Sequence, residues 1–190
     1  GWIDHDNDAS TPRIAQGAMY APDGTPFEFT LFTNQGNTRR EAIGTIVQDQ
    51  LSQIGIGVNY QTLDFNVLVE LLDQQTFDAV ILGWGNSYPY RADQRQIFGS
   101  TGDVIGGSNS GSYINPEIDD LFAQASAVPG CDIEARRAIY SEIQQILHED
   151  SPYLWLYSID GMYAWENGMQ NVTPYPGTLY WNVTQWTRSS

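Results

Sequence analysis

The chain has 190 residues, 41% of them hydrophobic, which is enough for one or two domains with a proper core. Its formal net charge is −15, from 23 acidic and 8 basic residues. This balance disfavours nucleic acid and anionic membranes as partners, because both would call for a basic patch. We found no apolar run of membrane-spanning length.

The opening segment is polar and rich in turn-forming residues. Its spacing of Asp4, Asp6 and Asp8 is similar to that of a calcium loop. However, the sixth and twelfth positions of such a loop are Ala9 and Ala15, where glycine and glutamate are required. We therefore predict a polar turn here and no metal site. The abrupt start is typical of the interior of a longer protein, so we expect an excised domain.

Strand and helix patterns alternate in the next part of the chain. The order is strand 27–33, helix 38–54, strand 56–62, helix 65–74 and strand 78–84. Thr38 and Glu41 have the spacing of a capping box, and Gly55 is placed to end the first helix. This order predicts parallel strands joined by helical crossovers. The strand 78–84 is apolar on both faces, which predicts a central position.

Three further elements complete the expected lobe. Two helices are predicted over 116–127 and 132–149, followed by a last buried strand at 153–157. The expected organisation is an irregular lead-in (1–26), an α/β ligand-binding lobe (27–158) and an irregular C-terminal segment packing on it (159–190).

A long loop follows Trp84, rich in glycine, serine, asparagine and tyrosine and poor in charges. Long loops are either functional or disordered, and the aromatic residues in this one argue against disorder. Open α/β sheets bind ligands beyond the carboxyl ends of their strands, so we predict a small-molecule cleft here.

The motifs of enzymes are missing. There is no nucleophile elbow, no Gly-rich phosphate loop and no zinc-protease motif. His148 falls at a predicted helix end and Cys131 has no catalytic signature around it, so we assign structural or incidental roles to both. We expect no catalysis and no cofactor.

Six segments, in order along nearly the whole chain, carry a resemblance to a known family. They are GWID (1–4), DGTPF (23–27), Arg39 with QLSQIGI (50–56), FDAVILGW (77–84), NSGSYINPEID (109–119), and Arg136 with YSEIQQILHEDSP (140–152). Each segment alone is weak evidence, but together they resemble the peptide/nickel-type (family 5) solute-binding proteins of ABC importers.

The resemblance implies a fold, a role and a location. The fold would be a periplasmic-binding-protein-like (type II) α/β lobe, with a mixed, mostly parallel sheet flanked by helices. The chain would be the C-terminal lobe of an extracytoplasmic receptor, periplasmic or lipid-anchored at the cell surface. It would close with the N-terminal lobe of the same parent over a solute and deliver it to an ABC transporter permease.

One departure from the family bears on the solute. Peptide-binding members that resemble this chain carry an aspartate three residues after the tryptophan of the Gly-Trp motif, where it pairs with the peptide's α-amino group. Here that position is Ser87. A buried ammonium needs an anionic partner, so peptides with a free amino group are in doubt and a neutral oligosaccharide is slightly favoured. Asp93 could fold back to replace the missing charge.

The candidate ligand-binding residues come from the loop and from the start of the first long helix; they are Trp84, Asn86, Ser87, Tyr88, Arg91, Asp93, Asn109 and Arg39. Each has a structural alternative. Trp84 can be core, Tyr88 can pack the loop, Asn109 can form a turn, and the arginines can pair with surface acids.

Two rival functions remain open. A carbohydrate-processing enzyme domain could use an aromatic cleft with carboxylates such as Asp93 and Asp103. An acidic protein-interaction domain would show a stable partner and no pocket.

Overall fold

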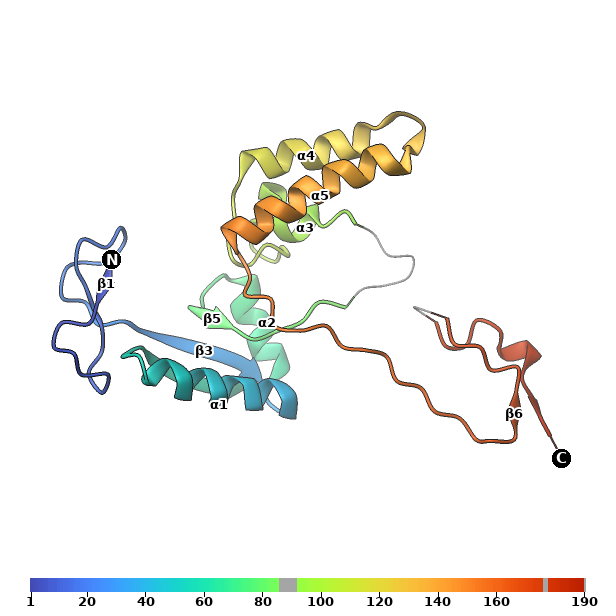
Figure 1. Ribbon diagram of the computed structural model, residues 1–190, viewed down its shortest axis with the longest axis horizontal. Coiled ribbons are helices and arrows are strands. Elements are labelled where there is room, and N and C mark those ends of the chain that lie inside the picture. The colour runs from blue at the N-terminus through green and yellow to red at the C-terminus, as the bar shows by residue number, and fades with distance from the viewer. Residues whose placement is uncertain (86–91, 176–177, 190) are drawn as a thin grey trace. The chain divides into compact units, whose positions relative to one another are not determined.

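The computed structural model describes residues 1–85, 92–175 and 178–189 (Figure 1). The chain divides into two compact units. The first comprises Gly1–Gly83 and Val104–Ser112, and the second comprises Trp84–Asp103 and Tyr113–Ser190.

The first unit is built on a parallel three-stranded sheet. Its strands are β3 (Glu28–Asn34), β4 (Gly57–Leu63) and β5 (Ala79–Val80), in the order β4-β3-β5. The crossovers are α1 (Thr38–Ser52) and α2 (Phe65–Asp73). The predicted alternation of strands and helices is therefore confirmed, as is the parallel sheet. A short antiparallel pair, β1 (Trp2–Ile3) with β2 (Ile14–Ala15), precedes it.

The prediction of a central strand at 78–84 is wrong for the described residues. There β5 is two residues long and pairs with β3 alone, while β3 pairs on both edges. The apolar character of this segment reflects packing: Ile81 is 8% exposed and joins Leu31 and Val58 in the core. Ala79, Val80 and Leu82 are only partly buried, so the apolar sequence did not require a hydrogen-bonded partner on both edges within the described residues.

The cap of α1 differs from the predicted capping box by one residue. Asn37, not Thr38, is the N-cap, and its side chain accepts a hydrogen bond from the Arg40 backbone N–H. The Glu41 carboxylate accepts from the Gly36 N–H at 2.7 Å, so the acid still satisfies a free donor. Gly55 has a φ of +72°, as the predicted glycine end of the helix requires.

The second unit is centred on a helical hairpin, α4 (Pro116–Ala127) and α5 (Ile133–Asp150), which lie side by side (Figure 1). Asn115 caps α4 and Asp132 caps α5 through side-chain oxygens. The hairpin buries an apolar core that includes Phe98, Ile118, Phe122 and Ile143. Both helices lie within one residue of their predicted bounds.

Short elements complete the second unit. They are α3 (Arg95–Phe98) and the 3₁₀ turns at Ser100–Gly102 and Pro129–Cys131, then the strands β6 (Met169–Gln170) and β7 (Thr187–Arg188) with a 3₁₀ turn at Val183–Gln185. The strands β6 and β7 pair antiparallel. Asn182, 3% exposed, donates to Asn171 and Thr173 and accepts from the Trp186 indole, which stabilises this C-terminal hairpin.

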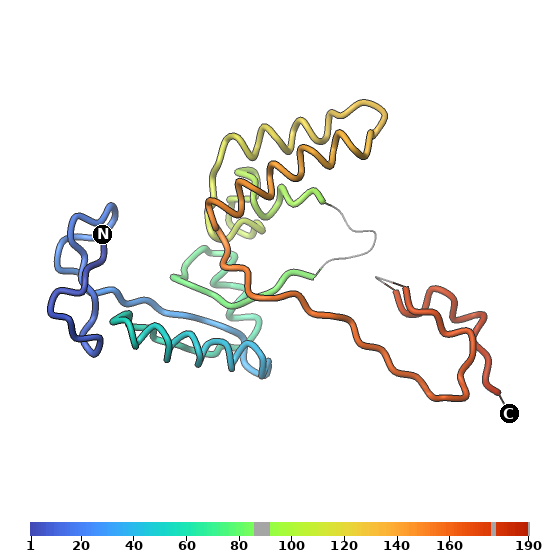
Figure 2. The backbone as a smooth tube through the Cα atoms, viewed as in Figure 1, coloured from blue at the N-terminus to red at the C-terminus, as the bar shows by residue number. Residues whose placement is uncertain are grey.

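The predicted buried strand at 153–157 is wrong. The backbone there is extended (Figure 2) but pairs with no strand among the described residues. Leu154 is 85% exposed and Leu156 is 57% exposed. An apolar sequence run reports a tendency to be buried. Here Tyr153 packs on the core of the second unit, while the residues after it are exposed.

In the described ranges, no helix combines the length and the apolarity that a membrane crossing requires.

Candidate functional site

The carboxyl end of the parallel sheet carries an arginine. The β3 strand ends at Asn34, whose side-chain oxygen accepts a hydrogen bond from Arg40 Nη1 at 2.6 Å. The Arg40 guanidinium also lies beside Gly83, because a Cβ placed on that glycine would be 3.4 Å from Nη2. Arg39, the predicted site residue, is exposed on the first turn of α1. Among the described residues, the guanidinium shown beside the ends of β3 and the segment after β5 is therefore that of Arg40.

Asn109 is buried in the first unit. It is 2% exposed, and its backbone carbonyl accepts from the Gln75 amide at 3.3 Å and from the Ser112 N–H at 3.2 Å. This geometry matches the turn-forming alternative for Asn109.

Trp84 begins the second unit and is 52% exposed, so it is not a core residue there. Its indole N–H donates to the Tyr153 hydroxyl at 3.4 Å. Tyr153 and Trp155 have ring centroids 5.4 Å apart, and both contact Phe98, at 5.1 and 5.8 Å. Burial raises the pKa of Tyr153, which keeps its hydroxyl neutral.

These four residues, Trp84, Phe98, Tyr153 and Trp155, are called the aromatic wall below. The sequence reasoning named Trp84 as a candidate but not the other three, and it assigned the segment 153–157, which holds two of them, to a buried strand. The available signal was the density of aromatic residues in that run, which fits a ligand surface as well as a core.

Asp93 is already paired within the second unit. It forms a salt bridge with Arg95, with Nη2 at 2.7 Å and Nε at 2.9 Å from its oxygens. Arg95 also donates to the Phe122 carbonyl and the Ser126 hydroxyl, so it joins the loop to α4. The hydrogen bond to Asp93 raises the pKa of Arg95. In this arrangement the charge of Asp93 is offset by a neighbouring guanidinium.

The other predicted site residues, Asn86, Ser87, Tyr88 and Arg91, lie outside the described residues.

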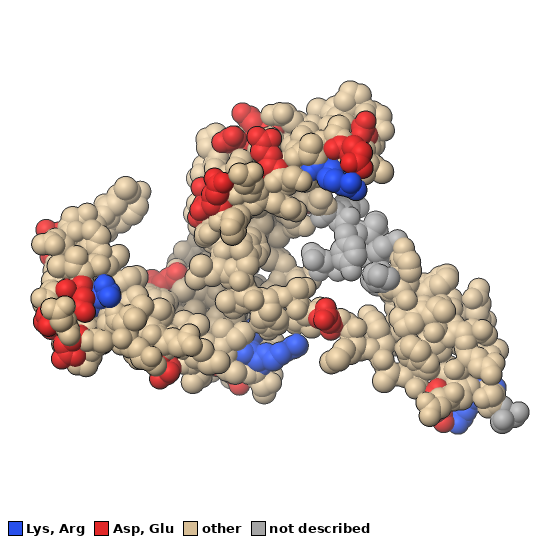
Figure 3. Space-filling view, in the orientation of Figure 1, with Lys and Arg blue, Asp and Glu red and all other residues tan. Residues whose placement is uncertain are grey.

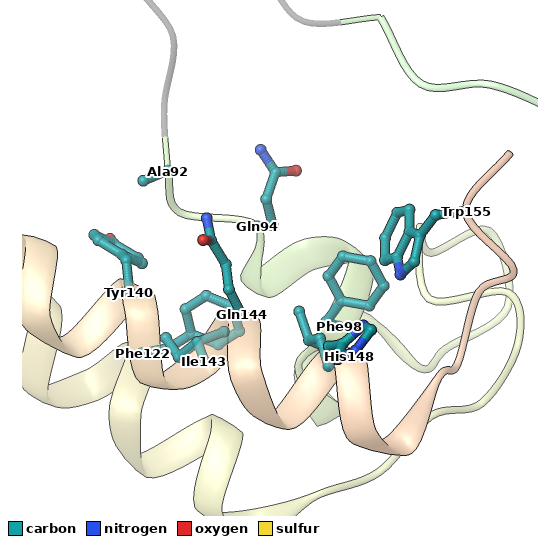
Figure 4. Close-up of a pocket in the computed structure, with 10 residues that line it drawn as sticks. Ala92, Gln94, Phe98, Phe122, Tyr140, Ile143, Gln144, His148 and Trp155 are labelled. Carbon is teal, nitrogen blue, oxygen red and sulfur yellow. The ribbon is translucent and has the colours of Figure 1, made fainter. Parts of the chain in front are cut away.

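A hollow of about 320 Å³ opens beside the aromatic wall in the second unit (Figure 4). Its floor is made of the core side chains Phe122, Ile143 and Leu147, and Gln94, Gln144 and His148 supply polar groups around it. Tyr140 lies at one end and Trp155 at the other (Figure 4). An apolar floor with a few polar groups is typical of ligand sites.

The chemistry of these groups suits binding. Among residues 1–85, 92–175 and 178–189, no cluster of three or more His, Cys, Asp or Glu could hold a metal ion. The polar groups around the hollow are amides and one imidazole, which can donate and accept hydrogen bonds.

The comparisons with known proteins agree on one family of solute-binding proteins. The sequence profile of "Bacterial extracellular solute-binding proteins, family 5 Middle" matches residues 4–105. The oligopeptide-binding protein AppA of Bacillus subtilis (strain 168) is 33% identical over 98% of this chain and 32% of its own length. The nickel-binding protein NikA of Staphylococcus aureus is 24% identical over 82% of this chain and 30% of its own length.

The structure of AppA from Bacillus subtilis in complex with a nonapeptide superposes with a TM-score of 0.75. The match has 32% identity and covers all of this chain and 35% of AppA. The chain therefore spans about a third of the length of the curated relatives that it matches. The fold is that of a type II periplasmic binding protein, as the sequence resemblance implied. The chain belongs to family 5 of the bacterial extracellular solute-binding proteins, and its location is extracytoplasmic.

Proposed function

We propose that the chain is the C-terminal lobe of an oligopeptide receptor that serves an ABC importer. The observation that carries this proposal is the match to AppA, which is collinear over 98% of the chain and named for oligopeptide binding. The receptor captures the solute without chemical change and delivers it to a membrane permease. None of the relatives reported above is named for an oligosaccharide or an enzymatic activity.

The aromatic wall is the proposed solute surface of this lobe. Trp84 is half exposed, and its indole is oriented by Tyr153 rather than buried in a core. Trp155 is also exposed, at 58%, whereas Phe98 and Tyr153 support the two tryptophans from beneath. Exposed aromatic rings offer large contact area at low cost in conformational entropy. A peptide backbone or an apolar side chain of the solute can pack against this surface.

A second exposed apolar surface is the proposed contact with a partner lobe of the same parent protein. Large apolar side chains are exposed along the extended segment 154–165, among them Leu154, Met162 and Trp165. Contiguous exposed apolar residues mark interaction sites in soluble proteins. Because the relatives are about three times as long as this chain, we assign this surface to the N-terminal lobe.

The test uses the longer receptor that contains this chain. Solute that co-purifies with it is identified by mass spectrometry, and binding of oligopeptides is then measured by calorimetry. Trp84→Ala should weaken peptide binding about tenfold or more, since a stacked aromatic contact is lost. Tyr20→Ala, at a residue 94% exposed in the first unit, is the matched control and should bind normally.

Two results would contradict the proposal. One is a co-purified solute that is not a peptide, combined with no measurable peptide binding. The other is turnover of a peptide or glycoside, which would indicate an enzyme instead of a receptor.

A further inference from the structure

The β5 segment is bound to β3 along one edge. The Ile81 N–H donates to the Phe32 carbonyl at 2.8 Å, and the Thr33 hydroxyl donates to the Ile81 carbonyl at 2.9 Å. At the start of the segment, the Asp78 carboxylate accepts a hydrogen bond of 2.8 Å from the Thr30 N–H. These contacts fix the segment against β3, so its opposite edge has a defined position in the first unit.

The backbone of Val80 faces this opposite edge. Successive residues of a strand direct their N–H and C=O groups to alternate sides, and Ile81 donates toward β3, so the Val80 groups point away from it. Among the described residues, no strand pairs with β5 on that side. The side chains of Ala79, Val80 and Leu82 are only partly buried. The outer edge of β5 is therefore an apolar strand edge that could pair with a further strand.

The outer edge of the sheet at β4 has a different composition. In the described parts of the chain β4 also pairs with β3 alone, but its exposed side chains are the polar Asn59, Gln61 and Thr62. Proteins protect permanent strand edges, because an unpaired edge is a template for another strand. The AVIL run at 79–82 has the continuous apolar sequence of a strand inside a parallel sheet. The sequences therefore suit β4 to a solvated edge and β5 to an edge that another strand covers.

The source of such a strand can be narrowed. The extended run 153–157 belongs to the second unit, where Tyr153 and Trp155 pack on Phe98. A second copy of the chain is disfavoured by charge repulsion, since the net charge is −15 and Figure 3 shows more acidic than basic side chains on the visible face. AppA matches 98% of this chain with only 32% of its own length, so most of that relative lies outside the matched region.

We propose that the outer edge of β5 pairs with a strand that the longer receptor supplies from outside residues 1–190. This strand extends the order β4-β3-β5 by one member. It carries apolar side chains, because it lies beside the partly buried Ala79, Val80 and Leu82. The inference rests on the proposal that the chain is part of a longer receptor. It goes beyond that proposal because it makes the rest of the receptor a structural component of this sheet.

Amide hydrogen exchange in the longer receptor, resolved residue by residue, tests the pairing. The Val80 N–H should exchange about a hundredfold or more slowly than in an unfolded chain, because a paired amide is released only when the sheet opens. The Thr62 N–H is the matched control. Gly57 donates to Phe27 on the β3 side, so Thr62, five residues further on, faces the outer edge of β4 and should exchange faster than Val80. Equal exchange rates at Val80 and Thr62 would overturn the proposal.

Proline substitutions separate strand pairing from simple burial. Proline has no N–H, so it is tolerated where that group faces solvent and is destabilising where the group pairs. In the longer receptor, Val80→Pro should lower the melting temperature more than Thr62→Pro does. A loss at Val80 no larger than that at Thr62 would contradict the pairing. If Val80→Pro does not fold, exchange in the wild type and cross-linking decide the question.

Cross-linking identifies the strand that pairs with β5. A photoreactive benzophenone amino acid replaces Val80 in the longer receptor, and mass spectrometry identifies the peptide to which it is joined. That peptide should come from the same molecule and from outside residues 1–190. A cross-link to 153–157, or between two copies of the receptor, would overturn the proposal.

Peptide binding, measured by calorimetry on the same receptor, separates this inference from the proposed function. An unprotected Val80 N–H in a receptor that binds peptides overturns the strand pairing alone. A protected Val80 with the expected cross-link, in a receptor that binds no peptide, supports the strand pairing and overturns the proposed solute.

Discussion

The Tyr113 hydroxyl donates a hydrogen bond of 2.5 Å to the Asp150 carboxylate, and this bond joins the start of α4 to the end of α5. The Asn115 side chain, which caps α4, donates to the same carboxylate at 3.0 Å. Burial, followed by the bond to Asp150, raises the pKa of Tyr113 to about 12. The two ends of the helical hairpin are thus held by a small polar network at its open side.

Removing the phenol hydroxyl should loosen this network. We expect Tyr113→Phe to lower the free energy of unfolding by about 1 kcal/mol, since one hydrogen bond to a charged group is lost at a partly exposed site. Urea denaturation followed by circular dichroism measures the change. Tyr20→Phe, at a residue that is 94% exposed, is the control and should be neutral. Equal stability of Tyr113→Phe and the wild type would show that the network is not stabilising.

The same network predicts acid sensitivity. Hydrogen bonds from Tyr113 and then Asn115 lower the pKa of Asp150 below 3.8 in the folded chain. A lowered carboxyl pKa adds stability above pH 3.8, and this stability is lost as the pH falls through the folded pKa. Asp150→Asn should therefore be less stable than the wild type near neutral pH, and the difference should close in strong acid.

Denaturant unfolding at several pH values tests this expectation. Asp160→Asn, at an exposed carboxylate without a hydrogen bond among the described residues, is the control. A gap between wild type and Asp150→Asn that is constant from neutral to acid pH would contradict the assigned cause.

Gly44 should not tolerate a side chain. It lies in α1 against Tyr60 of β4, and a Cβ added there would be 2.2 Å from the Tyr60 ring. Gly→Ala usually stabilises a helix interior, but here overpacking should dominate and cost about 1–3 kcal/mol. The control is Gly111→Ala, which has no atom within 4 Å of the added Cβ. A rise in the melting temperature of Gly44→Ala would contradict the packing of α1 on the sheet.

The described residues reserve no free carboxylate for the amino end of a solute near Asp93. Ser87 is neutral where similar peptide receptors carry an aspartate, and Asp93 is paired with Arg95. We therefore expect the longer receptor to bind N-acetylated peptides at least as tightly as free ones, because no carboxylate is reserved for an ammonium. Competition binding measures the ratio. Loss of binding on acetylation, reproduced by Asp93→Asn, would show that Asp93 pairs with the amino group.

The chain alone should bind solute poorly. In a two-lobed receptor each lobe supplies only part of the contact surface, and every tenfold loss of affinity corresponds to about 1.4 kcal/mol. We expect calorimetry to show binding by residues 1–190 weaker by several powers of ten than by the longer receptor. Equal affinities would place the whole site within this chain.

The sequence by itself determined the alternation of strands and helices from β3 to β5, the parallel sheet, the two helices α4 and α5, and the family. Helix periodicity and cap residues are local, so the bounds of α4 and α5 could be predicted to within a residue. The family followed from short segments in one order along the chain, and the profile match to residues 4–105 confirmed it.

Only the tertiary structure decided which strand is central and which side chains meet. The position of β3 depends on pairing across the sheet, and the strand-like run at 153–157 has the same pattern whether it is covered or exposed. The bond between Trp84 and Tyr153 joins residues 69 positions apart, and the pairing of Asp93 with Arg95 depends on the turn into α3. Such contacts are set by packing in three dimensions, which local propensity does not encode.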